Sequence, residues 1–162
     1  MRTIKAVKVT KENFSRFGEY YNMFEENDHN GDVWKCYMTK ETIISANSHL
    51  GYVVCDGGPS FLTDTMEHHI YSEEILFCGD QPTVLTVADS DPHGELKEED
   101  VESFILCAGD VVKLKKGIYH DANHAVDKPS YYYFIAGGSG QSDPSETFWH
   151  PVVPEPVKTI VW

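Results

Sequence analysis

The sequence predicts an all-β protein, a closed barrel or sandwich with one short helix near its start. Short runs rich in β-branched and aromatic residues follow one another at even spacing, and clusters of Gly, Pro, Asn and Asp that favour turns stand between them. The length of 162 residues, 41% of them apolar, fits a single domain with its own core.

The first expected element is the helix, which begins after Thr10. The Thr10 hydroxyl can cap the first turn, and Glu12 stands where the helix dipole favours negative charge. Phe14 and Phe17 share one helical face, and Gly18 is placed to end the helix.

The strands come next. We expect them at 34–39, 41–46, 51–55, 73–78, 83–88, 102–107, 110–116 and 131–137. Turn-forming segments fall at 27–32, 55–60, 79–82, 89–95, 115–117 and 137–144. The acidic segment 89–102 is expected to be a solvated connector with one helical turn.

From about residue 148 the sequence predicts an extended tail that contains three prolines, which disfavour a central strand. Residues 1–162 are expected to form one domain that includes this tail. Because the tail carries Val, Ile and Trp side chains, it could lie against a partner subunit, and we expect a homodimer.

The charge balance limits the possible partners. Twenty-six acidic against 13 basic residues give a formal net charge of −13, which repels phosphate backbones and anionic lipid. No apolar run has the length of a signal peptide or a spanning helix. We therefore expect a cytoplasmic protein that binds neither nucleic acid nor membrane. The four cysteines form no C-x-x-C pair and are expected to be buried thiols.

Candidate chemistry lies in two histidine-containing blocks. On a strand, Glu67 and His69 point to one side, and a tight turn could bring Glu74 back toward them. In the second block, His120 and His124 are expected to share a strand face. Such a cluster can bind Mn, Fe, Ni or Zn, act as acid and base without a metal, or form an inert hydrogen-bonded network.

Accessory groups near these blocks could contact a substrate. Lys113 and Lys115 are expected to share one strand face, from which a lysine could hold a carboxylate. Tyr71, Tyr119 and Tyr133 lie in or near the same strands and could donate hydrogen bonds.

At these residues the chain resembles the cupin superfamily. Its first motif appears as Glu67, His69, Glu74 and Gly79, with glutamate in place of the first histidine. Its second motif has lysine in place of proline and histidine in place of asparagine, and appears as Gly109, Lys115, Gly117, His120 and His124. The resemblance implies a six- to eight-stranded β-barrel, the double-stranded β-helix or jelly roll, with the site in its interior.

Within the cupins, the chain is similar to the ureidoglycolate lyase family. The similarity rests on segments 9–20, 67–69, 83–88, 117–120 and 137–139. Members usually carry glutamine at the position of Glu74, and tryptophan-histidine-histidine-proline at 119–122, so this chain departs from the pattern at both places.

This resemblance implies cleavage of ureidoglycolate, a small anionic substrate, to glyoxylate and urea, with Glu74 and His120 as the proton-transfer groups. It suggests Lys115, Tyr119 and His124 as substrate-binding residues and no organic cofactor. A divalent metal would be held by Glu67, His69, Glu74 and His120. Two alternatives are a metal-dependent cupin acting on another small polar substrate, as a sugar isomerase or ureido aminohydrolase, and a non-enzymatic small-ligand-binding cupin.

Overall fold

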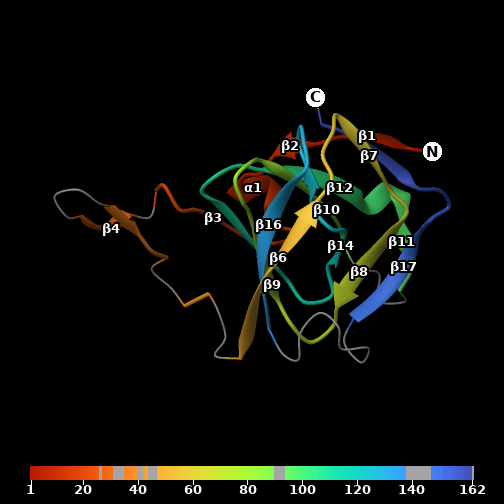
Figure 1. Ribbon diagram of the computed structural model, residues 1–162. Helices are drawn as coiled ribbons and strands as arrows, with labels where there is room; N and C mark the ends of the chain where they lie inside the picture. Colours follow the sequence, from red (N-terminus) through yellow and green to blue (C-terminus); the bar gives the residue numbers. More distant parts are fainter. Residues whose placement is uncertain are drawn as a thin grey trace.

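Two sheets face each other and enclose the main core of the computed structural model (Figure 1). The structure describes residues 1–25, 27–30, 35–39, 42–43, 47–89, 94–137 and 147–161. Nearly all the regular structure in these residues is β, so the prediction of an all-β jelly-roll barrel with a short N-terminal helix is confirmed.

The first sheet has five strands in the order β3-β13-β9-β16-β6, and every neighbouring pair is antiparallel. Its strands are β3 (Gly18–Asn22), β13 (Asp110–Leu114), β9 (Glu74–Cys78), β16 (Ser130–Gly137) and β6 (Ser48–Cys55).

The second sheet has eight strands, seven of them in the order β11-β17-β8-β14-β10-β12-β2, with β15 beside β10. Its strands are β11 (Leu96–Lys97), β17 (Thr147–Val153), β8 (Thr65–His69), β14 (Tyr119–His120), β10 (Thr83–Ala88), β12 (Val101–Leu106), β2 (Val7–Lys8) and β15 (His124–Ala125). The 3₁₀ turn η1 (Glu98–Asp100) supplies the single helical turn expected in the acidic connector, of which residues 90–93 lie outside the described part.

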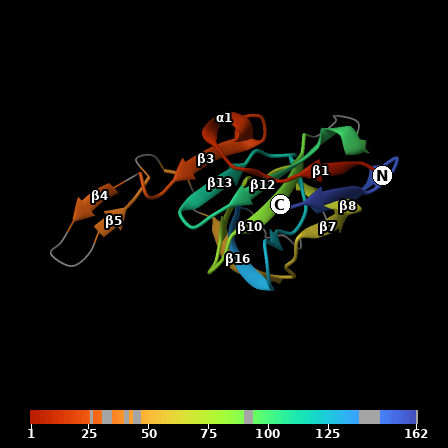
Figure 2. The same ribbon diagram turned by 90° about the horizontal axis from the view of Figure 1, so that it is seen from above.

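Two smaller sheets complete the fold. A three-stranded sheet contains β1 (Thr3–Lys5), β18 (Val157–Ile160) and β7 (Ser60–Thr63). The ribbon of β4 (Asn27–Asn30) and β5 (Lys35–Tyr37) lies apart from the barrel in both views (Figures 1 and 2). Of the turn predicted at 27–32, residues 27–30 instead form β4 and pair with β5, whereas residues 31 and 32 lie outside the described part of the chain. The strand predicted at 41–46 lies outside the described residues except for 42 and 43, which belong to no strand.

The main core fills the space between the five-stranded and eight-stranded sheets. Leu76 and Val112 reach it from the first sheet, and Leu85 and Val87 from the second. Residues that pair across neighbouring strands share a face. The strand registers therefore show which side chains point into the barrel.

The helix α1 (Lys11–Phe14) begins where the sequence predicts and closes one end of this core, but it ends at Phe14, and Gly18 begins β3 instead of ending the helix. Asn13 N–H donates to Thr10 Oγ1 at 3.2 Å, and Thr10 N–H donates to Asn13 Oδ1 at 2.8 Å, a reciprocal cap. The Phe14 ring packs edge-on against Phe104 at 5.3 Å. The chain needs glycine at Gly18, because a Cβ there would lie 1.9 Å from the carbonyl oxygen of Lys113.

The expected extended tail is instead folded into the sheets. β17 pairs with β8 in the eight-stranded sheet, and β18 is the central strand of the three-stranded sheet. Pro151 is tolerated because β11 pairs only with Val152 and Val153, so no ladder hydrogen bond is lost on that side. In the described part of the chain, no helix has the length and apolarity needed to cross a bilayer.

Candidate functional site

The four side chains predicted as a cluster converge inside the barrel. Glu67 and His69 come from β8, Glu74 from the start of β9, and His120 from β14. His120 pairs with both Glu67 and Val87, and Val87 belongs to the main core, so these side chains face the barrel interior. The alternation of side chains along β8 therefore places Glu67 and His69 on one face, as the sequence predicts.

One carboxylate is shared by two imidazoles. Glu74 Oε2 lies 2.9 Å from His120 Nε2 and 3.4 Å from His69 Nε2, and Glu67 Oε1 lies 3.8 Å from His120 Nε2. Glu74 is 1% exposed, and both histidines are also buried. Glu67 is the most accessible of the four, with its side chain 14% exposed.

The outer nitrogen of each imidazole is held by a group outside the cluster. His120 Nδ1 lies 3.2 Å from the carbonyl oxygen of Ile118, which can only accept, so Nδ1 carries the proton. His69 Nδ1 lies 3.1 Å from Thr147 Oγ1. Both Nε2 atoms therefore face the carboxylates, and no sequence signal pointed to Ile118 or Thr147 as their supports.

Burial and charge set the protonation of the cluster. Burial alone would raise the pKa of Glu74, but the hydrogen bonds and charges of His120 and His69 outweigh burial and lower that pKa. Burial alone would lower the pKa of His120, but Glu74 and Glu67 outweigh burial and raise it. Burial raises the pKa of Glu67. The site thus favours a Glu74 carboxylate beside a protonated His120.

The same groups fit a divalent metal ion. Glu67, His69 and His120 each offer one ligand atom, and the three atoms all lie within 4.8 Å of one another. Mixed carboxylate and imidazole donors suit Mn, Fe, Ni or Zn. Imidazoles whose outer nitrogen is hydrogen-bonded are also the usual form of histidine ligands.

The structure does not bring His124 to this cluster, so the expectation that His120 and His124 share a strand face is wrong. They lie on separate two-residue strands, β14 and β15. His124 pairs with Val84, which lies on the other side of β10 from Val87 and packs in a separate small core with Ala6, Val126 and Val161. Its ring stacks on Phe61 at 4.3 Å.

The two other predicted substrate-binding residues also lie elsewhere. Tyr119 precedes His120 on the same strand and therefore faces the opposite side, where it is fully buried and stacks on His68 at 4.4 Å. Lys115 follows the end of β13, and its Nζ donates to the carbonyl oxygens of Ser15 and Arg16, both at 2.9 Å. Lys115 therefore holds the end of the helix rather than a carboxylate of a substrate.

Three further candidates point away from the cluster. Lys113 lies 3.1 Å from Glu73 and 3.8 Å from Glu19, at the outer face of the five-stranded sheet. Tyr133 stacks on Phe77 on that same outer face. Tyr71 is 67% exposed.

A barrel of this topology, with its polar cluster in the interior, is a cupin-type fold. Among solved structures, the chain is similar to a 3,4-ketoisomerase from Helicobacter canadensis, with a TM-score of 0.57 and 14% identity over 80% of this chain and 88% of that one. It is also similar to the WlaRB TDP-quinovose 3,4-ketoisomerase from Campylobacter jejuni, with a TM-score of 0.55 and 11% identity over 79% and 89%.

A third similar structure is a dTDP-4-dehydrorhamnose 3,5-epimerase from Elizabethkingia anophelis, with a TM-score of 0.50 and 8% identity over 75% of this chain and 70% of that one. No protein-family model and no curated protein sequence matches the chain. At these identities the structures establish the shared fold, and they do not single out the ureidoglycolate lyase family.

Proposed function

We propose that this protein is an enzyme that moves protons on a small polar substrate, with a keto sugar as the preferred substrate class. The observation that carries the proposal is the Glu74 carboxylate, buried between the imidazoles of His69 and His120 with Glu67 beside them. Titratable groups held at hydrogen-bond distance in a barrel interior are suited to general acid–base catalysis.

The chemistry we infer is isomerisation of a ketone along a sugar ring. A base removes the proton from the carbon next to the carbonyl, and the resulting enediol is reprotonated at the former carbonyl carbon, while a hydroxyl proton passes between the two oxygens. His69 and His120 face the same space and can take and return these protons. Glu74 holds both rings in place and balances the charge of the protonated imidazole.

A divalent ion bound by Glu67, His69 and His120, with Glu74 beside it, would act as a Lewis acid on the substrate oxygens. The contribution of the chain is independent of that ion. It buries His69, Glu74 and His120 and fixes both imidazoles through Ile118 and Thr147.

The charge of the site favours a sugar ring over an anionic acid. Two carboxylates, Glu67 and Glu74, face the reaction space, whereas Lys113 and Lys115 are committed elsewhere. Because the protonated His120 balances Glu74, the repulsion of an anionic ureidoglycolate would come from Glu67 when it is ionised, and an uncharged sugar ring at the same place would not meet it. Two of the similar structures named above are a TDP-quinovose 3,4-ketoisomerase and a dTDP-4-dehydrorhamnose 3,5-epimerase, which supports the same substrate class.

The direct test is proton exchange with solvent. The protein is incubated with a TDP-linked keto sugar in deuterated water, with and without added divalent metal, and deuterium next to the carbonyl is followed by NMR. We expect incorporation that His120→Asn and Glu74→Gln reduce by at least about 100-fold, the scale of one general acid–base group. His124→Asn is the matched control and should retain the rate. A ligand-induced rise in Tm without exchange in any arm would instead indicate a binding protein.

Ureidoglycolate cleavage is the second candidate, favoured by the sequence similarity across both histidine blocks. In this reaction His69 and His120, rather than Glu74 and His120, would remove the hydroxyl proton and protonate the departing urea nitrogen. Release of urea and glyoxylate above the spontaneous rate tests it. Because lyase members usually carry glutamine at position 74, the Glu74→Gln variant should keep this activity, whereas it should lose keto-sugar exchange.

A further inference from the structure

The outer face of the five-stranded sheet is apolar where a water-facing sheet would be polar. An antiparallel sheet with one face on a core normally presents polar side chains on the other. On the outer face of β6, Leu50 is 70% exposed, Tyr52 65% and Val54 71%. Between them Val53 packs against the main core, so β6 is apolar on both faces.

Aromatic rings extend this outer face across three neighbouring strands. The Tyr52 ring of β6 lies 6.4 Å from the Tyr133 ring of β16, which stacks on Phe77 of β9 at 5.4 Å. Tyr131 lies 6.3 Å from Tyr52 on the same face. Such rings are enriched in protein interfaces and depleted on free surfaces.

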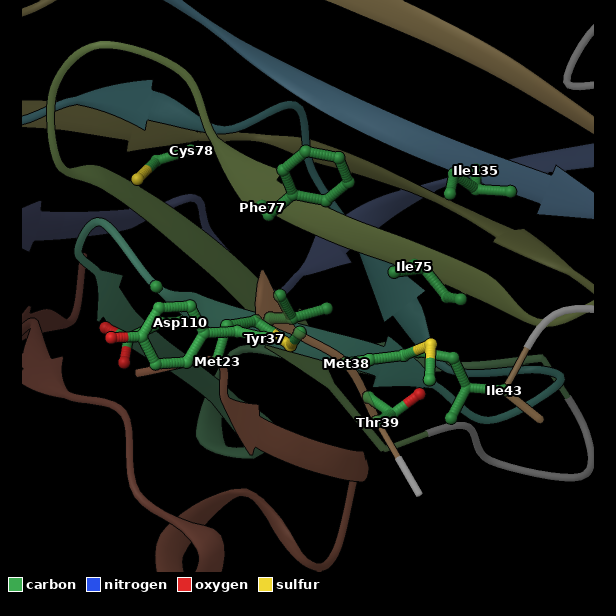
Figure 3. Close-up of a pocket in the computed structure, with 12 residues that line it drawn as sticks. Met23, Tyr37, Met38, Thr39, Ile43, Ile75, Phe77, Cys78, Asp110 and Ile135 are labelled. Atoms are coloured by element: carbon green, nitrogen blue, oxygen red, sulfur yellow. The ribbon is translucent and has the colours of Figure 1, made fainter. Parts of the chain in front are cut away.

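A cleft of about 450 Å³ adjoins the apolar face. It lies between the sheet and the residues at the end of β5 and after it, which include Tyr37, Met38 and Ile43. Figure 3 shows Ile75, Phe77 and Ile135 on the sheet side of this cleft, with Met38 and Ile43 on the other side. The cleft is separate from the candidate site, because Glu74 and Ile75 are neighbours on β9 and point to opposite faces.

Charge makes this face suitable for a second copy. The chain carries a net charge of −13, so two copies repel wherever acidic surfaces meet. In β6, β9 and β16 the one acidic residue is Glu74, which points inward, and these strands contain no Lys or Arg. Lys113 on the same outer face is paired with Glu73 and Glu19. Asp80 lies at the edge of the face, close enough to Tyr131 to add to the rise that Tyr133 causes in the pKa of that phenol.

We propose that a second copy of this chain docks on the outer face of β6 and β16, next to the cleft over β9 in which Ile75 is already buried. An uncharged aromatic face is complementary to itself, as a two-fold dimer requires. With about 3.3 Å per residue and about 4.8 Å between strands, the backbone of β6, β16 and β9 together measures roughly 25 Å by 15 Å. The side chains of this face and the adjoining cleft increase the area available for contact toward the roughly 800 Å² that each partner of a standard interface buries.

The test is the mass of the protein in solution, measured by sedimentation velocity over a dilution series. We expect twice the chain mass of 18.3 kDa for the wild type. Tyr52→Glu and Val54→Lys should each raise the dimer dissociation constant by at least about thirtyfold, the fold-change of an interface hot spot. Leu62→Glu is the matched control, because Leu62 is 54% exposed on β7, away from this face, and it should leave the dimer intact.

Two results would overturn the proposal. One is a wild-type protein that is monomeric at every concentration of the dilution series. This result overturns the proposal even if an apolar dye binds in the cleft. The other is a dimer that persists in both folded variants of the face, since the contact would then lie elsewhere. A thermal melt of each variant shows that it is folded, so that loss of the dimer can be assigned to the interface.

Discussion

The Nε2 atom of His120 lies 2.9 Å from Oε2 of Glu74, although β14 and β9 belong to different sheets. The contact therefore joins the two halves of the barrel across its interior. Both side chains are almost completely buried, so each charge depends on the other for compensation.

Replacing one member of this pair should destabilise the fold strongly. Glu74→Ala leaves the His120 and His69 imidazoles without their carboxylate, and we expect the free energy of unfolding to fall by about 3–5 kcal/mol. Urea unfolding near neutral pH in the presence of a chelator measures it. The control is Glu73→Ala, because the Glu73 side chain is 45% exposed, and it should cost less than about 1 kcal/mol. Equal losses in the two variants would show that the buried pair is not structural.

The cluster could be predicted because its geometry is local to each block. Glu67 and His69 differ by two positions on one strand, so alternation alone places them on one face. Glu74 follows after a short turn, and β9 starts at that residue. The helix cap at Thr10 was likewise readable, because it depends only on residues within one turn.

The substrate-binding residues could not be predicted because their positions depend on breaks in regular structure. The spacing of His120 and His124 suggests one strand, but the residues between them leave the sheet and the face changes at β15. Lys115 was expected to continue β13, yet that strand ends at Leu114. The strand at Pro151 was missed because the tolerance of proline depends on which edge of β17 is paired.

The three-ligand geometry predicts stoichiometric metal binding. Titration with Zn²⁺ or Mn²⁺ in a calorimeter should show one site per chain, and Glu67→Gln should weaken binding by more than about tenfold, since even changes outside the ligand shell cost 10–100-fold. His124→Gln should leave the affinity unchanged, because its ring packs on Phe61. Identical isotherms for the wild type and Glu67→Gln would mean that the cluster does not bind the ion.

Asp110 should act as a structural anchor at the turn before β13. Its carboxylate accepts hydrogen bonds from the Cys107 N–H at 2.7 Å and the Tyr20 hydroxyl at 2.8 Å, and it pairs with Lys8. Asp110→Ala leaves the half-buried Tyr20 hydroxyl and the Cys107 N–H without this acceptor, at about 1–3 kcal/mol for the two together. Urea unfolding should show this loss in full, whereas Lys8→Ala should show less than about 1 kcal/mol, since half of the Lys8 side chain is exposed.

The buried thiol of Cys78 should resist alkylation in a pH-dependent way. Burial raises the pKa of Cys78 to about 11, so near pH 8 only about one thiol in a thousand is the reactive thiolate. Cys107 is more accessible and should react with iodoacetamide at least about 100-fold faster. Mass spectrometry of a Cys36→Ser background measures both rates. The Cys78 rate should rise about tenfold per pH unit up to the pKa, since reactivity follows the thiolate fraction. In guanidinium chloride the two cysteines should react alike; a persistent difference there would assign the protection to local sequence rather than to the fold.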